Sequence, residues 1–266
     1  MECGFFSHCS ELILPKVISM NLSGSNVRDL ELFNDEHFPK LQNLILNGTK
    51  NVLNSKKLTK SLKYLSLQDS VVASLEIELP DLIALNLNGL KSEDSNGEHT
   101  GIVIAHSLKF LSMDRCEIVL KTTKESWESK VASEIPSLEY LTMTHFNCDE
   151  PILFPDSFKS VKILDVSNAS QLTIHGKYNG KDTFQLDGLE RFIARNSVFK
   201  CMDVLLSRKL TNLKEINVRG CKSLASCEHI KSVSLPCLED FNSSGSNISD
   251  KLIHLAEECI KRNKED

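Results

Sequence analysis

A nine-residue pattern recurs along this chain, and it constrains the fold more than any other feature of the sequence. In LQNLILNGT, residues 41–49, apolar side chains occupy positions 1, 4 and 6, and a small polar residue occupies position 9. Successive copies begin about 25 residues apart on average, a period typical of solenoids whose repeats pack only on their neighbours. The ten copies are VISMNLSGS, LQNLILNGT, LKYLSLQDS, LIALNLNGL, LKFLSMDRC, LEYLTMTHF, VKILDVSNA, LERFIARNS, LKEINVRGC and LEDFNSSGS.

The alternation within each copy predicts a short strand. Leu44 and Leu46 lie two residues apart, so both side chains point to one side of the strand, while positions 3, 5 and 7 point to the other. One such unit cannot bury its own leucines, whereas stacked units bury one another's. We therefore predict stacked strands with positions 1, 4 and 6 in the core. Ala194 and Ser243 at position 6 make the eighth and tenth copies the weakest.

The pattern resembles the leucine-rich-repeat family. The phrases FPKL, LPDL, IPSL and LPCL, and the segment LKEINVRGCKSL, are similar to the irregular intracellular repeats of plant NLR immune receptors. The resemblance implies an α/β fold, a right-handed leucine-rich-repeat solenoid (horseshoe) of about ten repeats with a parallel inner sheet. It covers the repeats only, and receptor activity is not carried over because no nucleotide-binding P-loop occurs. Similar irregular repeats occur in F-box substrate receptors and in bacterial effectors.

Three segments are expected along the chain. Residues 1–16 are predicted to form an N-terminal cap, residues 17–247 the leucine-rich repeats, and residues 248–266 a C-terminal capping helix. In the last segment Ser249 is a plausible N-cap residue. The apolar stripe of this helix consists of Ile248, Leu252, Leu255, Ala256, Cys259 and Ile260.

Repeat length and position 9 both vary, which predicts an irregular solenoid. The longest steps hold extra residues at 91–101, 121–133 and 175–187. The first and third contain Gly and Asn and are predicted to be exposed loops, and the second is predicted to be a short helix. Position 9 is mostly Ser, Thr or Cys, but Leu90, Phe146 and Ala169 cannot form hydrogen bonds there.

Composition excludes several classes of function. A formal charge of −5 gives no basic footprint for nucleic acid, and no apolar run of about 18 residues predicts a membrane span. Nine cysteines without a C-x-x-C pair, and a start that does not read as a secretory signal, predict a reducing, cytoplasmic location. Five Asn-x-Ser/Thr sequences are interpreted as turn chemistry instead of glycosylation sites: Asn21, Asn47, Asn168, Asn242 and Asn247.

No motif in the chain predicts catalysis, a cofactor or a metal. The sequence lacks G-x-S-x-G, G-x-G-x-x-G and G-x-x-x-x-G-K-[S/T]. The cysteines and histidines near residues 3–9 and 221–237 lack the paired spacing of a structural zinc site. We therefore predict a protein that is not an enzyme and that needs no cofactor.

The concave face is the predicted binding surface. Aromatic residues recur at position 3, where the core does not need them, and exposed apolar groups rimmed by polar ones are typical of binding sites. The alternative is that these rings stack on their neighbours and stiffen the sheet. Small Ala84 should leave a notch between aromatic walls, and the arginines should suit an acidic segment of the partner. The predicted partner-binding residues are Tyr64, Ala84, Phe110, Tyr140, Ile163, Arg191, Arg195 and Arg219.

These features predict a non-enzymatic protein–protein interaction module, monomeric, that binds a protein or peptide ligand on its concave face in intracellular recognition or signalling. One alternative is a substrate-recognition subunit of a ubiquitin ligase that works with a separate adaptor. Another is a secreted or translocated effector that binds a host protein. An enzyme hidden in the loops is a third alternative, which only an activity screen would reveal.

Overall fold

The computed structural model divides into two compact units, residues 1–138 and residues 139–266, and each is described by itself. The predicted helix at 121–133 lies outside the described residues except for Ser133, and only residues 13–16 of the predicted N-terminal cap are described. The described residues are 13–25, 27, 30–52, 58–72, 75–93, 100–120, 133–146, 158–170, 177–178, 181–182, 186–198, 205–206, 210–224, 233 and 235–265.

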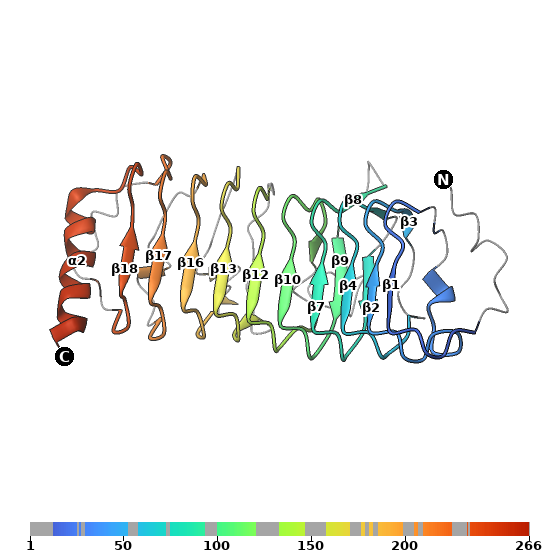
Figure 1. Ribbon diagram of the computed structural model, residues 1–266. Coiled ribbons are helices and arrows are strands. Elements are labelled where there is room, and N and C mark those ends of the chain that lie inside the picture. The colour runs from blue at the N-terminus through green and yellow to red at the C-terminus, as the bar shows by residue number, and fades with distance from the viewer. Residues whose placement is uncertain are drawn as a thin grey trace. The chain divides into compact units, whose positions relative to one another are not determined.

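The first unit is built on a ladder of short parallel strands, one from each repeat (Figure 1). Neighbouring strands pair position 3 with position 3, position 4 with 4 and position 5 with 5. The predicted register is therefore confirmed in this unit. The strands are β1 (Ser19–Asn21), β2 (Asn43–Ile45), β4 (Tyr64–Ser66), β7 (Ala84–Asn86) and β10 (Phe110–Ser112).

The second unit repeats this arrangement with the same register. It ends in helix α2, Asp250–Glu265. The described residues contain ten repeat strands, five in each unit. Each unit has the architecture of a leucine-rich-repeat solenoid with a parallel sheet, as predicted. The strands are β12 (Tyr140–Thr142), β13 (Ile163–Asp165), β16 (Arg191–Ile193), β17 (Glu215–Asn217) and β18 (Asp240–Asn242).

The core is formed by positions 1, 4 and 6, as the pattern predicts. Leu44, Leu65 and Leu164 at position 4 are fully buried, whereas Met20 and Phe241 in the first and last repeats are half-buried. This difference is expected because an end repeat has another repeat on one side only.

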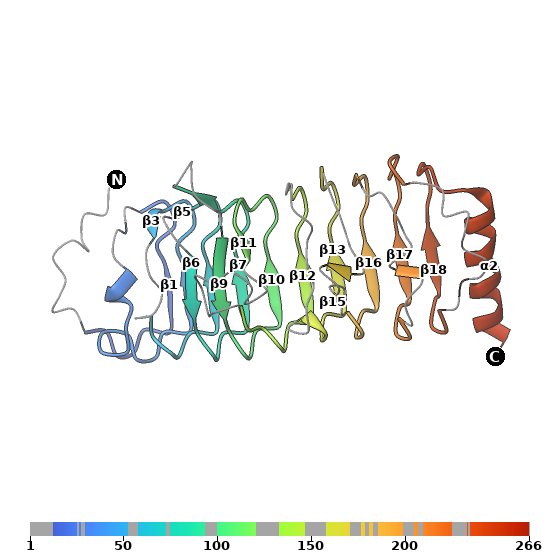
Figure 2. The same cartoon turned by 180° about the vertical axis from the view of Figure 1, so that it is seen from behind.

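The outer side of the first unit carries strands that the sequence analysis missed (Figure 2). The predicted exposed loop at 91–101 is wrong, because both of its ends belong to strands and Gly101 is buried. A signal was present in Leu75–Glu78, where Leu75 and Ile77 are buried and alternate with glutamates. One outer sheet contains β3 (Lys50–Val52), β5 (Val71–Val72) and β8 (Lys91–Ser92), and the other contains β6 (Leu75–Glu78), β9 (Thr100–Ile104) and β11 (Val119–Leu120).

Two shorter elements also lie outside the repeat strands. The 3-10 helix η2 spans Leu30–Leu32 in the first unit. In the second unit, the antiparallel pair β14 (Lys177–Tyr178) and β15 (Lys181–Asp182) lies inside the predicted loop at 175–187. The segment predicted to be a loop therefore contains a pair of antiparallel two-residue strands, which the sequence analysis did not predict.

Position 8 of every repeat adopts a left-handed backbone conformation, with φ between 54° and 74°. Glycine fills it in five repeats, and Asp69, Arg115, His145, Asn168 and Asn196 fill it in the others. Asn and Asp tolerate this conformation, whereas it is uncommon for Arg and His. The turn that leaves each strand is therefore fixed by geometry and not by one residue type.

Position 9 is buried except at Ser25 and Ser246 in the end repeats, and its side chain is of two kinds. Where it is polar, its hydroxyl donates to a carbonyl at position 6, as Ser70 does to Leu46 at 2.8 Å and Ser197 does to Val166 at 2.8 Å. Where it is apolar, as at Phe146, the side chain joins the core. The predicted irregularity of this position is therefore confirmed.

Helix α2 packs against β18 and buries Leu252, Ala256 and Cys259. Near its end, the Asn263 amide donates to the carbonyls of Leu235 and Leu238 at 2.9 Å and 3.0 Å. The carbonyl of Leu235 also accepts the N–H of Leu238 at 3.1 Å, so Asn263 adds to a turn that the last repeat already forms. No helix within the described part of the chain is long and apolar enough to cross a membrane.

Truncating a core leucine should destabilise the fold. Leu65→Ala, Leu111→Ala and Leu141→Ala should each lower the free energy of unfolding by about 2–5 kcal/mol, because each leaves a cavity at a buried position 4. Urea unfolding measures the loss. Ile83→Ala, at a side chain that is 39% exposed, is the control and should change stability by less than about 1 kcal/mol. Unchanged midpoints in all three core variants would contradict the register.

Deleting residues 249–266 should lower both solubility and stability, because the apolar side chains of the last repeat would face water. The milder variant Asn263→Ala removes two hydrogen bonds to buried carbonyls and should lower the free energy of unfolding by about 1–3 kcal/mol. Lys264→Ala, at an exposed site on the same turn, is the matched control. A truncated chain as soluble and as stable as the whole one would show that α2 does not cap the repeats.

The buried thiol of Cys116 should make stability fall in alkaline solution. Burial raises the pKa of Cys116 from 9.0 to about 11. Between these values the thiol ionises in the unfolded chain but not in the folded one, so folding loses up to about 1.4 kcal/mol per pH unit as pH rises. Unfolding free energies measured at about pH 8 and about pH 10 should therefore fall more for the parent than for Cys116→Ala. Equal losses of unfolding free energy in the two proteins would show that burial does not keep the Cys116 thiol protonated.

Candidate partner-binding face

Positions 3, 5 and 7 of the repeat strands point away from the core, and their side chains form what we call the open face of each unit. Strand β2 illustrates the pattern, because Leu44 is fully buried while Asn43 and Ile45 on either side of it are half-buried. All eight predicted partner-binding residues lie on the open face of one unit or the other.

In the first unit the open face carries an aromatic row at position 3. The register aligns Tyr64 with Ala84 and Ala84 with Phe110. Phe110 is 46% exposed, and Tyr64 and Ala84 are half-buried, so neither ring is turned into the core. Because strands in a sheet are about 4.8 Å apart, the two aromatic positions are separated by about 10 Å, with a methyl group between them. The predicted arrangement of a small residue between two rings is therefore present.

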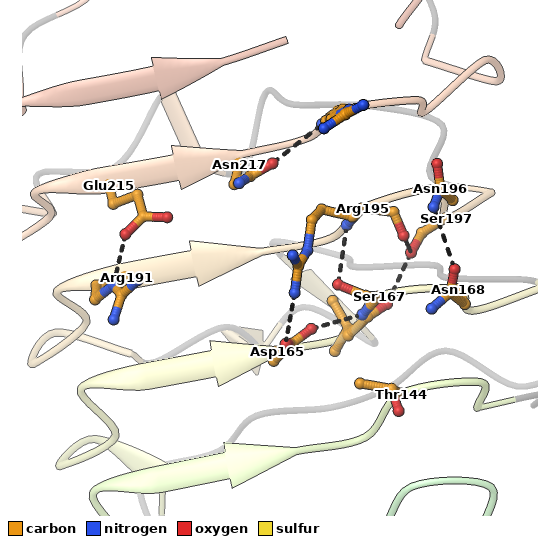
Figure 3. Close-up of polar contacts among 12 residues, drawn as sticks. Thr144, Asp165, Ser167, Asn168, Arg191, Arg195, Asn196, Ser197, Glu215 and Asn217 are labelled. Carbon is orange, nitrogen blue, oxygen red and sulfur yellow. Dashed lines mark hydrogen bonds and ion pairs between the residues drawn. The ribbon is translucent and has the colours of Figure 1, made fainter. Parts of the chain in front are cut away.

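In the second unit the same row changes from apolar to charged. Tyr140 is 37% exposed, and Ile163 on the next strand is half-buried. Further along the row, the Nε of Arg191 donates to Oε2 of Glu215 at 2.5 Å (Figure 3). This hydrogen bond raises the pKa of Arg191. Glu215 therefore offsets the charge of Arg191. The sequence analysis had instead expected this arginine to bind an acidic segment of the partner.

A second charged row lies at position 2 of the second unit. Lys162 reaches Glu139 at 2.8 Å, and Lys214 reaches Glu190 at 2.9 Å. The hydrogen bonds to these glutamates raise the pKa of both lysines. Because the groups are exposed, the pairs contribute little to stability, but they favour this register over a shifted one.

Many polar side chains of the open face bind the backbone at position 7. Where position 5 is Asn or Asp, its side-chain oxygen accepts the N–H of position 7 in the same repeat, as in an Asx turn. Asp165, for example, accepts from Ser167 at 2.9 Å. The other pairs are Asn21 with Ser23, Asn86 with Asn88, Asn217 with Arg219 and Asn242 with Ser244.

In three repeats whose position 5 is Ser66, Ser112 or Ile193, the acceptor comes from position 7 of the preceding repeat. Asn47 accepts from the N–H of Gln68 at 3.2 Å, and Ser167 accepts from the N–H of Arg195 at 3.1 Å. The side-chain oxygen of Asn88 accepts from the N–H of Asp114 in the same way, at 2.8 Å. These contacts show a structural role for polar residues that the sequence analysis placed on a binding face. They also confirm the interpretation of Asn21 and Asn242 as turn residues.

The second unit has a pocket of about 450 Å³ at the carboxyl ends of its strands. Its lining comes from positions 5, 7 and 8 of four consecutive repeats. Sequence analysis identified two of its residues, Arg195 and Arg219. It missed Asn168 and Asn196 because it did not count position 8 as part of this face, and it did not single out the polar residues at positions 5 and 7. The lining residues are Thr144, Asp165, Ser167, Asn168, Arg195, Asn196 and Arg219.

The two arginines of the pocket differ in their surroundings. A nitrogen of the Arg195 guanidinium lies 3.8 Å from Oδ2 of Asp165, and the side chain is 52% exposed (Figure 3). Arg219 donates its backbone N–H to Asn217, but its guanidinium has no ion pair with any residue that the structure describes. The lining thus holds two cations and one anion, a net charge of +1.

The chemistry of the described residues offers recognition groups more than reactive ones. No three His, Cys, Asp or Glu side chains within the described ranges are grouped so that they could hold a metal ion. The buried thiols of Cys116 and Cys221 have raised pKa values because of burial, which disfavours the nucleophilic thiolate.

Comparison with known proteins gives distant structural likenesses only. The sequence matches no known family profile, and no curated protein matches it. An internalin from Listeria monocytogenes is 15% identical with a TM-score of 0.40, over 88% of this chain and 76% of that one. The mouse RP105/MD-1 complex gives 13% identity and a TM-score of 0.38, over 89% of this chain and 51% of that one. A TLR13–ssRNA13 complex gives 15% identity and a TM-score of 0.36, over 91% and 51%. In the last two, this chain spans about half the length of the chain it matches.

Proposed function

We propose that this chain is a non-enzymatic protein-interaction module that binds a protein or peptide partner on its open face. The observation that carries the proposal is the position-3 row of the first unit, where Tyr64, Ala84 and Phe110 align on neighbouring strands. The core is already filled by positions 1, 4 and 6, so these residues are not needed for its packing.

An aromatic row of this kind is suited to recognition. Aromatic side chains bury a large area with few rotatable bonds, and they are enriched among residues that dominate binding energy. Tyr64 and Phe110 do not stiffen the sheet by stacking directly on each other, because Ala84 occupies the strand between them. The gap above Ala84 instead suits an apolar side chain of the partner, flanked by two rings.

We further propose that the protein works inside the cell. Free cysteines support this: Cys116, Cys221, Cys237 and Cys259 form no disulfide among the described residues. Unpaired thiols persist in a reducing compartment, whereas oxidising compartments favour disulfides. The open face is built from polar groups that bind the backbone and from a few exposed rings. Such a face is consistent with a monomer that acts in recognition or signalling and needs no cofactor.

Substituting the aromatic row should weaken binding of peptides selected on this protein. Peptides from a random-peptide phage library are selected on the full chain, and their affinities are measured by fluorescence anisotropy. Phe110→Ser and Tyr64→Ser should each lose about 2 kcal/mol, or about thirtyfold in Kd, because each removes an aromatic anchor. Ala84→Leu should weaken binding similarly by filling the notch.

Val198→Ser is the matched control, because Val198 is 38% exposed but lies off the strand face. Circular dichroism checks that every variant keeps its fold. If the selected peptides bind the Phe110→Ser, Tyr64→Ser double variant as tightly as the parent, the open face of the first unit is not the binding surface.

A further inference from the structure

We propose that Arg195 and Arg219 form a clamp for a carboxylate side chain of the partner, so that the second unit selects an acidic peptide. This inference rests on the proposed function and assigns the chemistry of the ligand. Sequence position alone suggested three equivalent arginines, whereas the contacts separate the paired Arg191 from the two that line the pocket.

The strand register brings the two arginines side by side. Both occupy position 7, two residues beyond Ile193 and Asn217, which are paired across β16 and β17. Neighbouring strands are about 4.8 Å apart, so one carboxylate can lie between the two guanidinium groups. Arg and carboxylate groups form short, charge-assisted hydrogen bonds, often in pairs.

The backbone beneath the clamp is held in place before a ligand arrives. The N–H of Arg195 donates to Ser167, and the N–H of Arg219 donates to Asn217. Fixing the backbone in this way lowers the entropy lost on binding. The side chains keep donors for a ligand, since Arg219 has no described ion pair and a guanidinium carries five N–H groups.

Asp165 sets the charge that the pocket accepts. Its carboxylate lies near Arg195 at 3.8 Å, beyond hydrogen-bond distance, so it orients this arginine without saturating it. With Asp165 present the lining carries a net charge of +1. One carboxylate brings this net charge to zero, whereas a dianion makes it negative. The pocket of about 450 Å³ has room for the side chain that bears the carboxylate. Asn168 and Asn196, joined by a 3.4 Å amide contact, add neutral polar groups to the lining.

The test uses the full chain and a tetraglutamate peptide as the probe. NMR follows the side-chain Nε–Hε signals of the arginines during titration. We expect saturable shifts at Arg195 and Arg219, and none that saturate at Arg191, whose Nε is bound to Glu215. Arg219→Gln should weaken the peptide at least about tenfold, and Arg219→Lys should recover only part of this loss, because lysine lacks the planar fork.

Asp165→Asn provides the opposite test. Asparagine keeps the oxygen that accepts the Ser167 N–H, as Asn217 does for Arg219 in the next repeat but one, so the turn should survive. The substitution removes the competing charge and should tighten tetraglutamate binding about threefold to tenfold. Lys214→Gln is the matched control, because it removes one exposed cation from the same repeat as Arg219 outside the pocket, and it should leave the affinity unchanged.

Several outcomes would overturn the clamp. These are a tetraglutamine peptide that binds equally well, all three arginines shifting alike, Arg219→Gln without effect, or inorganic phosphate binding at lower concentration than tetraglutamate. The last would assign the pocket to a dianion. Failure of the clamp can be distinguished from failure of the proposed function. Binding of the selected peptides can depend on Phe110 while binding of tetraglutamate does not change in Arg219→Gln, and the reverse can also occur.

Discussion

Mutual burial between neighbouring repeats is the interaction on which the rest of this structure depends. A repeat contributes apolar side chains at positions 1, 4 and 6, and none of them can leave water unless another repeat lies beside it. The pairing of position 3 with position 3 follows directly, because a shift by one residue would place polar side chains in the core. The half-buried Met20 and Phe241 show the consequence at end repeats, which have one neighbour instead of two.

The open face is governed by a second requirement, that the N–H of position 7 must find an acceptor where the chain turns off the strand. Asn or Asp at position 5 meets it within the repeat, and in three other repeats a residue of the preceding repeat does so, as Ser167 does for Arg195. Polar residues on this face therefore have a structural role first. This requirement does not explain Phe110 or the guanidinium of Arg219, and the proposed function assigns both of them to recognition.

Much of this could be predicted from the sequence, because period and alternation determine which residues share a face. The repeat positions, the strand register and the exposure of Phe110 follow from spacing alone. The pairing of Arg191 with Glu215 was also predictable, since opposite charges stood at position 3 of adjacent strands. The sequence analysis treated the arginines as one patch because it counted charges by type and did not compare neighbours along each row.

The outer strands and the pocket were harder to predict, for different physical reasons. The outer strands are two to five residues long and lie within repeats of unequal length, so their pairing depends on how each turn closes. The pocket depends on position 8, whose left-handed conformation aims Asn168 and Asn196 at the ends of the strands. Asparagine serves there because it tolerates positive φ, and its amide is then presented beside position 7. A residue chosen for backbone geometry thus becomes part of a surface, and for this reason the lining of the pocket could not be read from residue types alone.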